Sequence, residues 1–113
     1  MSRFSINGET WQVIFVKHND PRLMDRTHNI RLGTTDPKAH TVYLSDALRG
    51  DLLERVVIHE LGHCAIVSYG LLDDIHRMTK RRCWVEAEEW VCNFLANYSR
   101  ELLGIAEDIL KEV

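Results

Sequence analysis

The sequence predicts an α+β fold, in which a small antiparallel β-sheet is followed by two long helices packed on one of its faces. Segments rich in β-branched and aromatic residues occupy much of the first 45 positions, and two longer segments with helical apolar spacing follow them. Only two prolines occur, and no linker, repeat or low-complexity stretch divides the 113 residues. We therefore expect one domain spanning residues 1–113, with a single modest core.

Three strands are expected in the sheet. Residues 10–16 (TWQVIFV), 29–35 and 40–45 have the β-branched and aromatic character of strands. Asp36 and Pro37 lie between the last two segments and favour a turn, so these two segments are predicted to form a hairpin. The polar, irregular segment before the hairpin is expected to contain at most a short helical turn.

The first long helix is predicted between Ser45 and Gly70. Either Ser45 or the aspartate after it can cap the first turn, and glycine is a common C-terminal stop. A connecting segment, 71–82, leads to a second long helix over residues 83–103. Gly104 is expected to interrupt that helix and to separate it from a short last helix.

Composition and charge argue against several classes of protein. The formal net charge of −3 does not favour general binding to nucleic acid or to an anionic membrane. No apolar run reaches the roughly 18–20 residues of a membrane helix, and the N-terminal segment lacks the apolar stretch of a signal peptide. The three cysteines form no Cys-x-x-Cys pair, which is typical of a reducing compartment. We therefore expect a cytoplasmic protein, with Cys64 and Cys92 as small core residues.

The strongest functional signal is the motif His-Glu-x-x-His, formed by His59, Glu60 and His63 within the first predicted helix. Residues four apart on a helix project from one face, so both imidazoles can reach one zinc ion. Glu60 lies about 100° round the helix from His59, where it can take a proton from a metal-bound water. A pair of hydrogen-bonded structural histidines is the alternative interpretation.

A catalytic zinc ion needs three protein ligands, so one ligand must come from outside the motif. No further histidine follows His63 at a short spacing, but the second predicted helix offers Glu86, Glu88 and Glu89. Acidic residues in the first turns of a helix also stabilise its N-terminus, which accounts for one or two of them. On a helical wheel Glu88 falls inside the apolar arc and Glu89 on its edge, which leaves these two as close rivals.

The two helical segments resemble the gluzincin clan of zinc metallopeptidases. In that clan the metal-binding glutamate lies on a helix after the His-Glu-x-x-His helix. A small residue follows it three positions later, and an Asp, Asn or Glu comes next. Glu89, Cys92 and Asn93 match this pattern, whereas Glu88 does not match it and Glu86 matches it poorly.

Residues 30–103 are most similar to the phage and mobile-element members of the clan, the immunity-repressor metallopeptidases and the minigluzincins. This resemblance implies a minimal zincin-like fold and a zinc-dependent endopeptidase that cleaves a narrow protein or peptide target. It implies Glu60 as the general base and acid. The implied zinc ligands are His59, His63 and Glu89.

Further expectations concern the surroundings of the metal. The resemblance implies that the Asn93 amide hydrogen-bonds the ring N–H of His59, and that the strand 40–45 is a sheet edge that pairs with extended substrate. Gly62 either permits close approach of the second helix or the hairpin, or is a tolerated glycine without a packing role. The candidates for stabilising the oxyanion are His76, Tyr69, Tyr98 and Arg77.

Two other functions are compatible with the sequence. In the first, the zinc is structural or vestigial, and the chain is a regulatory or protein-binding domain of a phage or mobile element. The small size of the chain favours this alternative, because 113 residues leave little material for a deep substrate cleft. In the second, the chain is a zinc hydrolase that acts on a bond other than the peptide bond, which the His-Glu-x-x-His motif disfavours.

Overall fold

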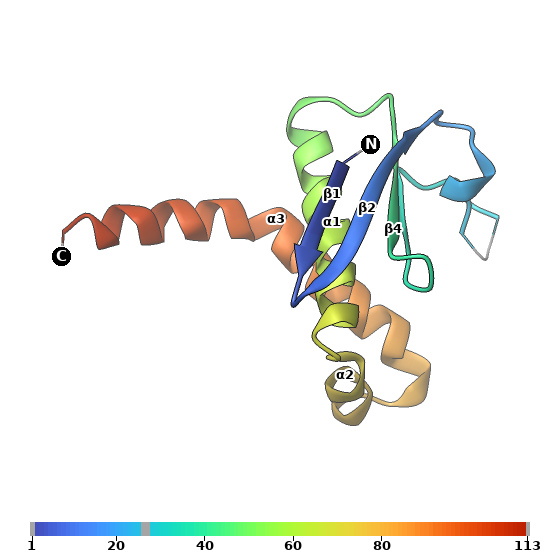
Figure 1. Cartoon of the computed structure of the whole chain (residues 1–113). Coiled ribbons are helices and arrows are strands. Elements are labelled where there is room, and N and C mark those ends of the chain that lie inside the picture. The colour runs from blue at the N-terminus through green and yellow to red at the C-terminus, as the bar shows by residue number, and fades with distance from the viewer. Residues whose placement is uncertain (1, 26–27, 113) are drawn as a thin grey trace.

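Four strands form one sheet, and helices pack on one face of it, in a computed structural model that describes residues 2–25 and 28–112 (Figure 1). The order of the strands is β1-β2-β4-β3. The strands are β1 (Ser2–Ile6), β2 (Glu9–Val16), β3 (Gly33–Asp36) and β4 (Thr41–Ser45). The helices are α1 (Gly50–Ser68), α2 (Leu72–Met78) and α3 (Trp84–Leu110), with 3-10 turns η1 (Pro21–Leu23) and η2 (Arg81–Cys83).

The predicted α+β class is confirmed, but the sheet is mixed rather than wholly antiparallel. The predicted hairpin forms from β3 and β4, with Thr35 opposite Val42. Its second strand, β4, pairs in parallel with β2, with Val13 opposite Val42. Insertion of β4 between β2 and β3 buries Thr41, Val42, Leu44 and Ser45 to 1–2% exposure. The apolar strand of the hairpin therefore occupies the interior of the sheet.

The position of β4 corrects the expectation that residues 40–45 form the edge of the sheet. The edge strand on this side is β3, which has one hydrogen-bonded neighbour, β4. The predicted strand 29–35 is also shorter than expected, because only Gly33–Asp36 pairs with β4 and Ile30 forms an isolated bridge with Met24.

Strand β1 was not predicted from the sequence. It pairs with β2 through a two-residue turn at Asn7 and Gly8, with Ile6 opposite Glu9. Both turn residues have positive φ, 49° and 78°. Asn-Gly between two apolar-alternating segments is the strongest short hairpin signal, so the sequence did contain the information.

Helix α1 begins later than predicted, at Gly50. Ser45 ends β4, and its hydroxyl accepts a hydrogen bond from the amide of Ala47 instead of capping a helix. The predicted stop at Gly70 is confirmed by its φ of 67° and by backbone bonds from Gly70 to Val67 and from Leu71 to Ile66. This pattern satisfies the last carbonyls of the helix.

The last two helices also differ from the prediction. Residues 72–78 of the predicted connector form the short helix α2. Helix α3 runs without interruption through Gly104 to Leu110, so the predicted break at Gly104 is wrong. A glycine inside a helix costs about 1 kcal/mol relative to alanine, which a helix of this length tolerates.

The core lies between the sheet and α1. Its buried residues include Trp11, Leu44 and Cys64. The indole N–H of Trp11 donates to the hydroxyl of Ser68 at 2.8 Å, which ties β2 to the C-terminal end of α1. A second cluster, which includes Ile66 and Cys92, lies between α1, α2 and α3. Cys64 and Cys92 are fully buried, as predicted.

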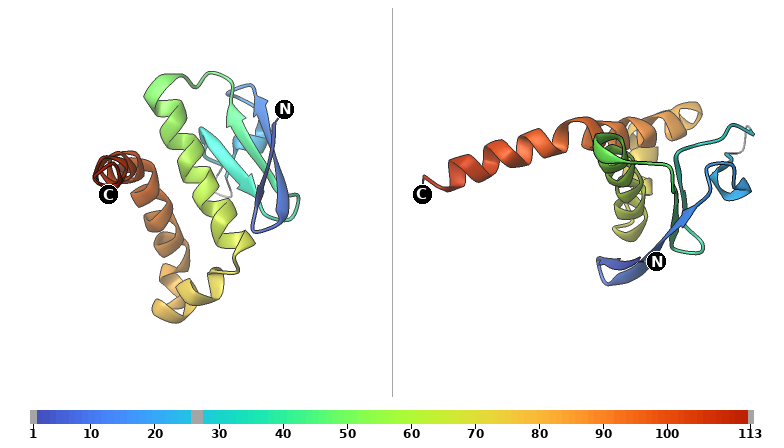
Figure 2. Two further views of the ribbon diagram at one scale, coloured as in Figure 1. Left: turned by 60° about the vertical axis from the view of Figure 1, so that its left-hand side comes forward. Right: turned by 90° about the horizontal axis from the view of Figure 1, so that it is seen from above.

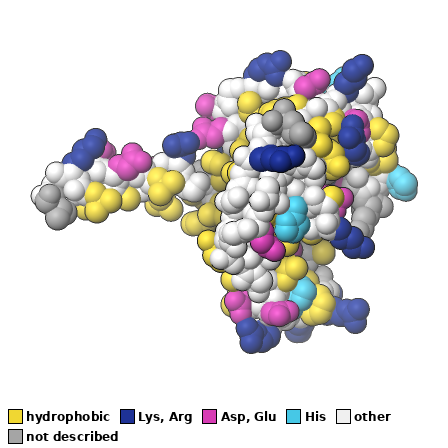
Figure 3. Space-filling view, in the orientation of Figure 1, with side chains coloured by type: hydrophobic (Ala, Val, Ile, Leu, Met, Phe, Trp, Pro, Cys, Tyr) yellow, Lys and Arg dark blue, Asp and Glu magenta, His cyan; other side chains and the backbone are white. Residues whose placement is uncertain are grey.

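Helix α3 has two different halves. Its first half packs against α1, whereas its second half projects away from the rest of the molecule (Figures 1 and 2). Hydrophobic side chains line the projecting half (Figure 3), and Tyr98, Leu102, Ile105 and Ile109 are each more than half exposed. No helix in the described part of the chain has the length and apolar character that a bilayer span requires.

Candidate metal centre

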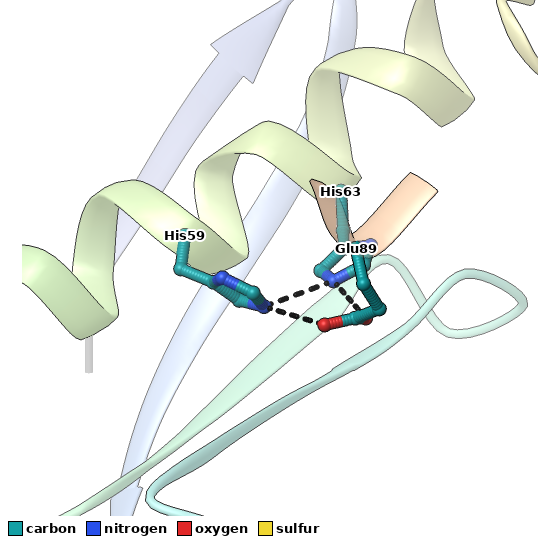
Figure 4. Close-up of side chains that lie close together, drawn as sticks. All are labelled: His59, His63 and Glu89. Atoms are coloured by element: carbon teal, nitrogen blue, oxygen red, sulfur yellow. Dashed lines mark hydrogen bonds and ion pairs between the residues drawn. The ribbon is translucent and has the colours of Figure 1, made fainter. Parts of the chain in front are cut away.

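Helices α1 and α3 bring three side chains to one point. His59 and His63 project from the same face of α1, and Glu89 reaches them from the first half of α3 (Figure 4). The Nε2 atom of His59 lies 3.2 Å from one carboxylate oxygen of Glu89, and the Nε2 atom of His63 lies 2.9 Å from the other. The two Nε2 atoms are 3.3 Å apart.

These distances fit a single metal ion. Ligand atoms that lie roughly 2.0–2.2 Å from a tetrahedral zinc ion are about 3.4 Å from one another. The three donor atoms of His59, His63 and Glu89 lie within 4.8 Å of one another, and the observed separations are close to the tetrahedral value. Two imidazoles and one carboxylate also leave the fourth position of a tetrahedral ion open. The group could therefore hold a metal ion.

Gly62 explains how α3 comes close enough to α1. A Cβ atom at Gly62 would lie 3.1 Å from the sulfur of Cys92 and 3.4 Å from its Cα atom. The missing side chain thus permits close packing of the two helices beside the two histidines. This observation agrees with the first of the two expectations for Gly62, and it identifies the second helix rather than the hairpin as the neighbour.

Glu88 has a different partner from Glu89. One carboxylate oxygen of Glu88 lies 2.5 Å from Nδ1 of His63. A carboxylate that accepts the Nδ1 proton leaves Nε2 free to bind a metal and fixes the orientation of the ring. Glu88 therefore contacts the back of His63, and Glu86 is exposed and does not line the cleft described below. Among the three rival acids, only Glu89 joins the two imidazoles.

Glu60 is buried beside the three donor atoms without belonging to them. It is 6% exposed, and the hydroxyl of Thr35 in β3 donates to one of its carboxylate oxygens at 2.8 Å. The other oxygen lies 3.8 Å from Nε2 of His59. Burial raises the pKa of the Glu60 carboxyl, although Thr35 and the two histidines act in the opposite direction. A carboxyl with a raised pKa is suited to exchange protons.

The charges of the ligand group are strongly coupled. Hydrogen bonds from His59 and His63 hold the pKa of the Glu89 carboxyl well below its usual range. Burial acts to lower the pKa of the His63 imidazole, but Cys92, Glu88 and Glu89 outweigh burial and raise it. A protonated imidazole competes with a metal for the same nitrogen, so metal binding at this group releases protons.

A cleft of about 950 Å³ opens over the group. It is bounded by β3, by α1 and by the first half of α3, and it contains His59, Glu60, His63, Glu88 and Glu89. The cleft is larger than the small size of the chain suggested. The walls lie close together where β3 meets α1, because a Cβ atom at Gly33 would come within 2.9 Å of Val56 and 3.1 Å of Glu60.

The remaining predicted residues do not contribute in the expected way. Asn93 lines the cleft and is exposed, and it has no hydrogen bond to His59 in the described structure. None of the four oxyanion candidates lines the cleft. His76 stacks on Trp84 with ring centroids 3.8 Å apart, and Arg77 pairs with Asp74. Tyr69 and Tyr98 are more than half exposed elsewhere on the surface.

Sequence reasoning missed Thr35, Arg31 and Arg55. Thr35 hydrogen-bonds Glu60, and all three residues line the cleft. Nothing in the sequence singles out Thr35, because it lies 25 positions from Glu60 and only strand β3 brings the two together. Arg55 did carry a signal, since it precedes His59 by four positions and so shares its helix face.

No protein-family model matches the chain, and neither a curated protein nor a solved structure shows significant similarity to it. The resemblance to gluzincins therefore stays a prediction that rests on the sequence motifs. The geometry of His59, His63 and Glu89 independently indicates that the group could hold a metal ion.

Proposed function

We propose that this protein is a zinc-dependent endopeptidase, in which His59, His63 and Glu89 bind the zinc ion. The observation that carries the proposal is the arrangement of two imidazole nitrogens and one carboxylate group, with nitrogen–nitrogen and nitrogen–oxygen distances of 2.9–3.3 Å, beside a second, buried carboxylate in one open cleft. Two nitrogens and one carboxylate are typical ligands of a catalytic zinc ion. Magnesium and calcium are disfavoured, because they prefer oxygen ligands.

The residues of the chain have separate tasks in this proposal. A bound zinc ion would polarise the peptide carbonyl and lower the pKa of the attacking water. Glu60 takes the proton of that water and passes it to the leaving amine. Thr35 holds the Glu60 carboxylate from the strand side, and Glu88 holds the ring of His63 from the helix side. Thr35 and Glu88 are not among the three metal-binding residues of this proposal, so each of them acts by orienting its partner, Glu60 or His63.

The substrate is a peptide or protein segment in an extended conformation. The cleft runs along β3, which is the edge of the sheet and has one side unpaired within the sheet. An extended segment can add to such an edge through main-chain hydrogen bonds. We place the protein in the cytoplasm, where the free thiols of Cys64, Cys83 and Cys92 stay reduced. A narrow target, such as a regulatory protein, fits this setting better than general digestion.

The test combines metal analysis with cleavage of a mixed peptide library. We expect about one zinc ion per chain in the purified protein and cleavage sites that mass spectrometry can identify. Glu60→Gln should retain zinc and lower kcat/KM by at least about 100-fold, which is the usual contribution of a general base. Glu86→Gln, an exposed substitution of the same kind on α3, is the matched control. Full activity of Glu60→Gln, or a protein without zinc, would contradict the proposal.

A non-catalytic zinc-containing domain is the second candidate. The projecting apolar half of α3 favours it, because exposed apolar surface often marks a contact with another protein. This candidate predicts zinc binding without cleavage of any peptide. It also predicts that binding of a partner is the same for the wild type and for Glu60→Gln.

A further inference from the structure

One guanidinium group on the wall of the cleft has no function in the site described above. Arg55 lies on α1 four positions before His59 and eight before His63, so the three side chains lie on one helix face. All three line the same cleft. The separation along the helix axis between residues four apart is about 6 Å, so Arg55 is about one turn away from His59 and about two turns away from His63.

The acidic side chains of the cleft are already engaged with other partners. Glu89 pairs with both histidines, Glu88 binds His63, and Glu60 accepts from Thr35. Asp25 pairs with Arg31, the other arginine of the cleft, at 2.7 Å. The side chain of Arg55 has no hydrogen bond or ion pair with any residue of 2–25 or 28–112, and it is exposed. Its positive charge is therefore free to meet a ligand.

We propose that Arg55 forms a carboxylate-binding subsite, so that the cleft selects peptides with a carboxylate about two residues from the cleaved bond. This inference rests on the proposed peptidase function and names its substrate class. A guanidinium group binds a carboxylate through two parallel hydrogen bonds. An extended peptide rises about 3.3 Å per residue. The helix rise of about 6 Å from Arg55 to His59 therefore corresponds to about two peptide residues. Side chains two residues apart point to the same side.

The carboxylate has two sources in a peptide, an acidic side chain and the free C-terminus. The first source makes the enzyme selective among internal sites, and the second makes it selective for sites near the end of a chain. Arg55 would bind either carboxylate through the same hydrogen bonds. Peptides that vary the acidic side chain and the C-terminus separately distinguish the two sources. Arg31 contributes less to either, because Asp25 already compensates its charge.

The test uses zinc-loaded protein and blocked hexapeptide pools in which one position is fixed as Glu, Gln or Lys. We expect the wild type to prefer Glu over Gln at one position by roughly two- to fivefold in kcat/KM, the range of a partly exposed ion pair. Arg55→Met should remove this preference, and Arg55→Glu should replace it with a preference for Lys. Arg82→Glu is the matched control, because it makes the same charge change on an exposed residue outside the cleft. It should keep the wild-type preference.

The same pools with free or amidated C-termini identify the source of the carboxylate. A preference that follows the free acid, and that Arg55→Met removes, assigns the subsite to the terminal carboxylate. Equal cleavage of the Glu and Gln pools together with equal cleavage of the free-acid and amidated pools, or a preference that survives Arg55→Met, would overturn the subsite while leaving the peptidase proposal intact.

Binding supplies a readout that does not depend on cleavage. Zinc-loaded Glu60→Gln should bind the preferred Glu pool more tightly than the Gln pool, and the difference should shrink in high salt. If no pool is cleaved, the peptidase proposal fails and the binding comparison still decides the subsite. Equal affinity for the Glu and Gln pools, and for pools with free and amidated C-termini, would then overturn it.

Discussion

Glu88 and Glu89 show how much one position on a helix changes the task of a side chain. They are neighbours in α3 and differ by about 100° in direction. Glu89 faces the Nε2 atoms of both histidines, whereas Glu88 reaches the Nδ1 atom on the other side of the His63 ring. Of two identical carboxylates, one therefore joins the group that could hold a metal ion, and the other supports a histidine of that group.

This division predicts different losses of zinc affinity. Glu89→Ala should remove stoichiometric zinc, because it deletes one of three ligands. Glu88→Ala should retain zinc but bind it roughly 10- to 100-fold more weakly, the usual effect of losing a support of a metal-binding histidine. Glu86→Ala should bind zinc as the wild type does. Competition with a chromogenic chelator measures all three affinities. Loss of zinc in Glu88→Ala together with its retention in Glu89→Ala would reverse the assignment.

Gly62 in α1 and Gly104 in α3 differ in how they affect the packing of the helices. Gly62 lies where α1 and α3 pack closely, with the sulfur of Cys92 at 3.1 Å from the position of a Cβ atom. Gly104 lies in the projecting half of α3, where a Cβ atom would meet nothing within 4 Å among the described residues. Packing thus favours a glycine at the first position, while helix propensity acts at the second.

Substitution of these glycines should change stability in opposite directions. Gly62→Val should lower the free energy of unfolding by roughly 1–3 kcal/mol, because its side chain overpacks the interface between the helices. Gly104→Ala should raise the free energy of unfolding by up to about 1 kcal/mol, because alanine has the higher helix propensity. Urea denaturation measures both. A stable Gly62→Val variant would contradict the close packing of α1 and α3.

The whole molecule consists of a packed body and a projecting helical arm. The principal dimensions of 49 × 36 × 26 Å reflect this shape, and Figures 1 and 2 show that the arm is the second half of α3. The site lies entirely in the body, because its ligands come from α1 and from the first half of α3. The arm therefore contributes apolar surface but no residue to the group of His59, His63 and Glu89.

Substitution of one isoleucine in the body and one in the arm should show that the two parts contribute differently to stability. Ile66 is 4% exposed within the core cluster of α1, α2 and α3, so Ile66→Ala should lower the free energy of unfolding by roughly 2–5 kcal/mol. Ile109 is 57% exposed on the arm, so Ile109→Gln should change the free energy of unfolding by no more than about 0.5 kcal/mol. Thermal and urea unfolding at low protein concentration provide the comparison. A large loss of stability in Ile109→Gln would show that the arm is packed in solution.

Local sequence patterns were sufficient to predict the α+β class, the hairpin of β3 and β4 and the common helix of His59, Glu60 and His63. These features are local, because the helical repeat sets the relative directions of residues four apart without any knowledge of the rest of the chain. The stop of α1 before Gly70 is also a local feature, because the backbone after the helix adopts a positive φ that favours glycine.

Three features follow from the packing of distant segments instead: which glutamate contacts the histidines, which strand forms the edge of the sheet and which residues surround Glu60. A helical wheel describes the direction of Glu88 and Glu89 about their own axis, but not the distance from that axis to α1. That distance follows from packing at Gly62. The contact of Thr35 with Glu60 likewise depends on the insertion of β4 into the sheet, which is a pairing between distant segments. Such long-range contacts depend on the whole chain, and no local pattern encodes them.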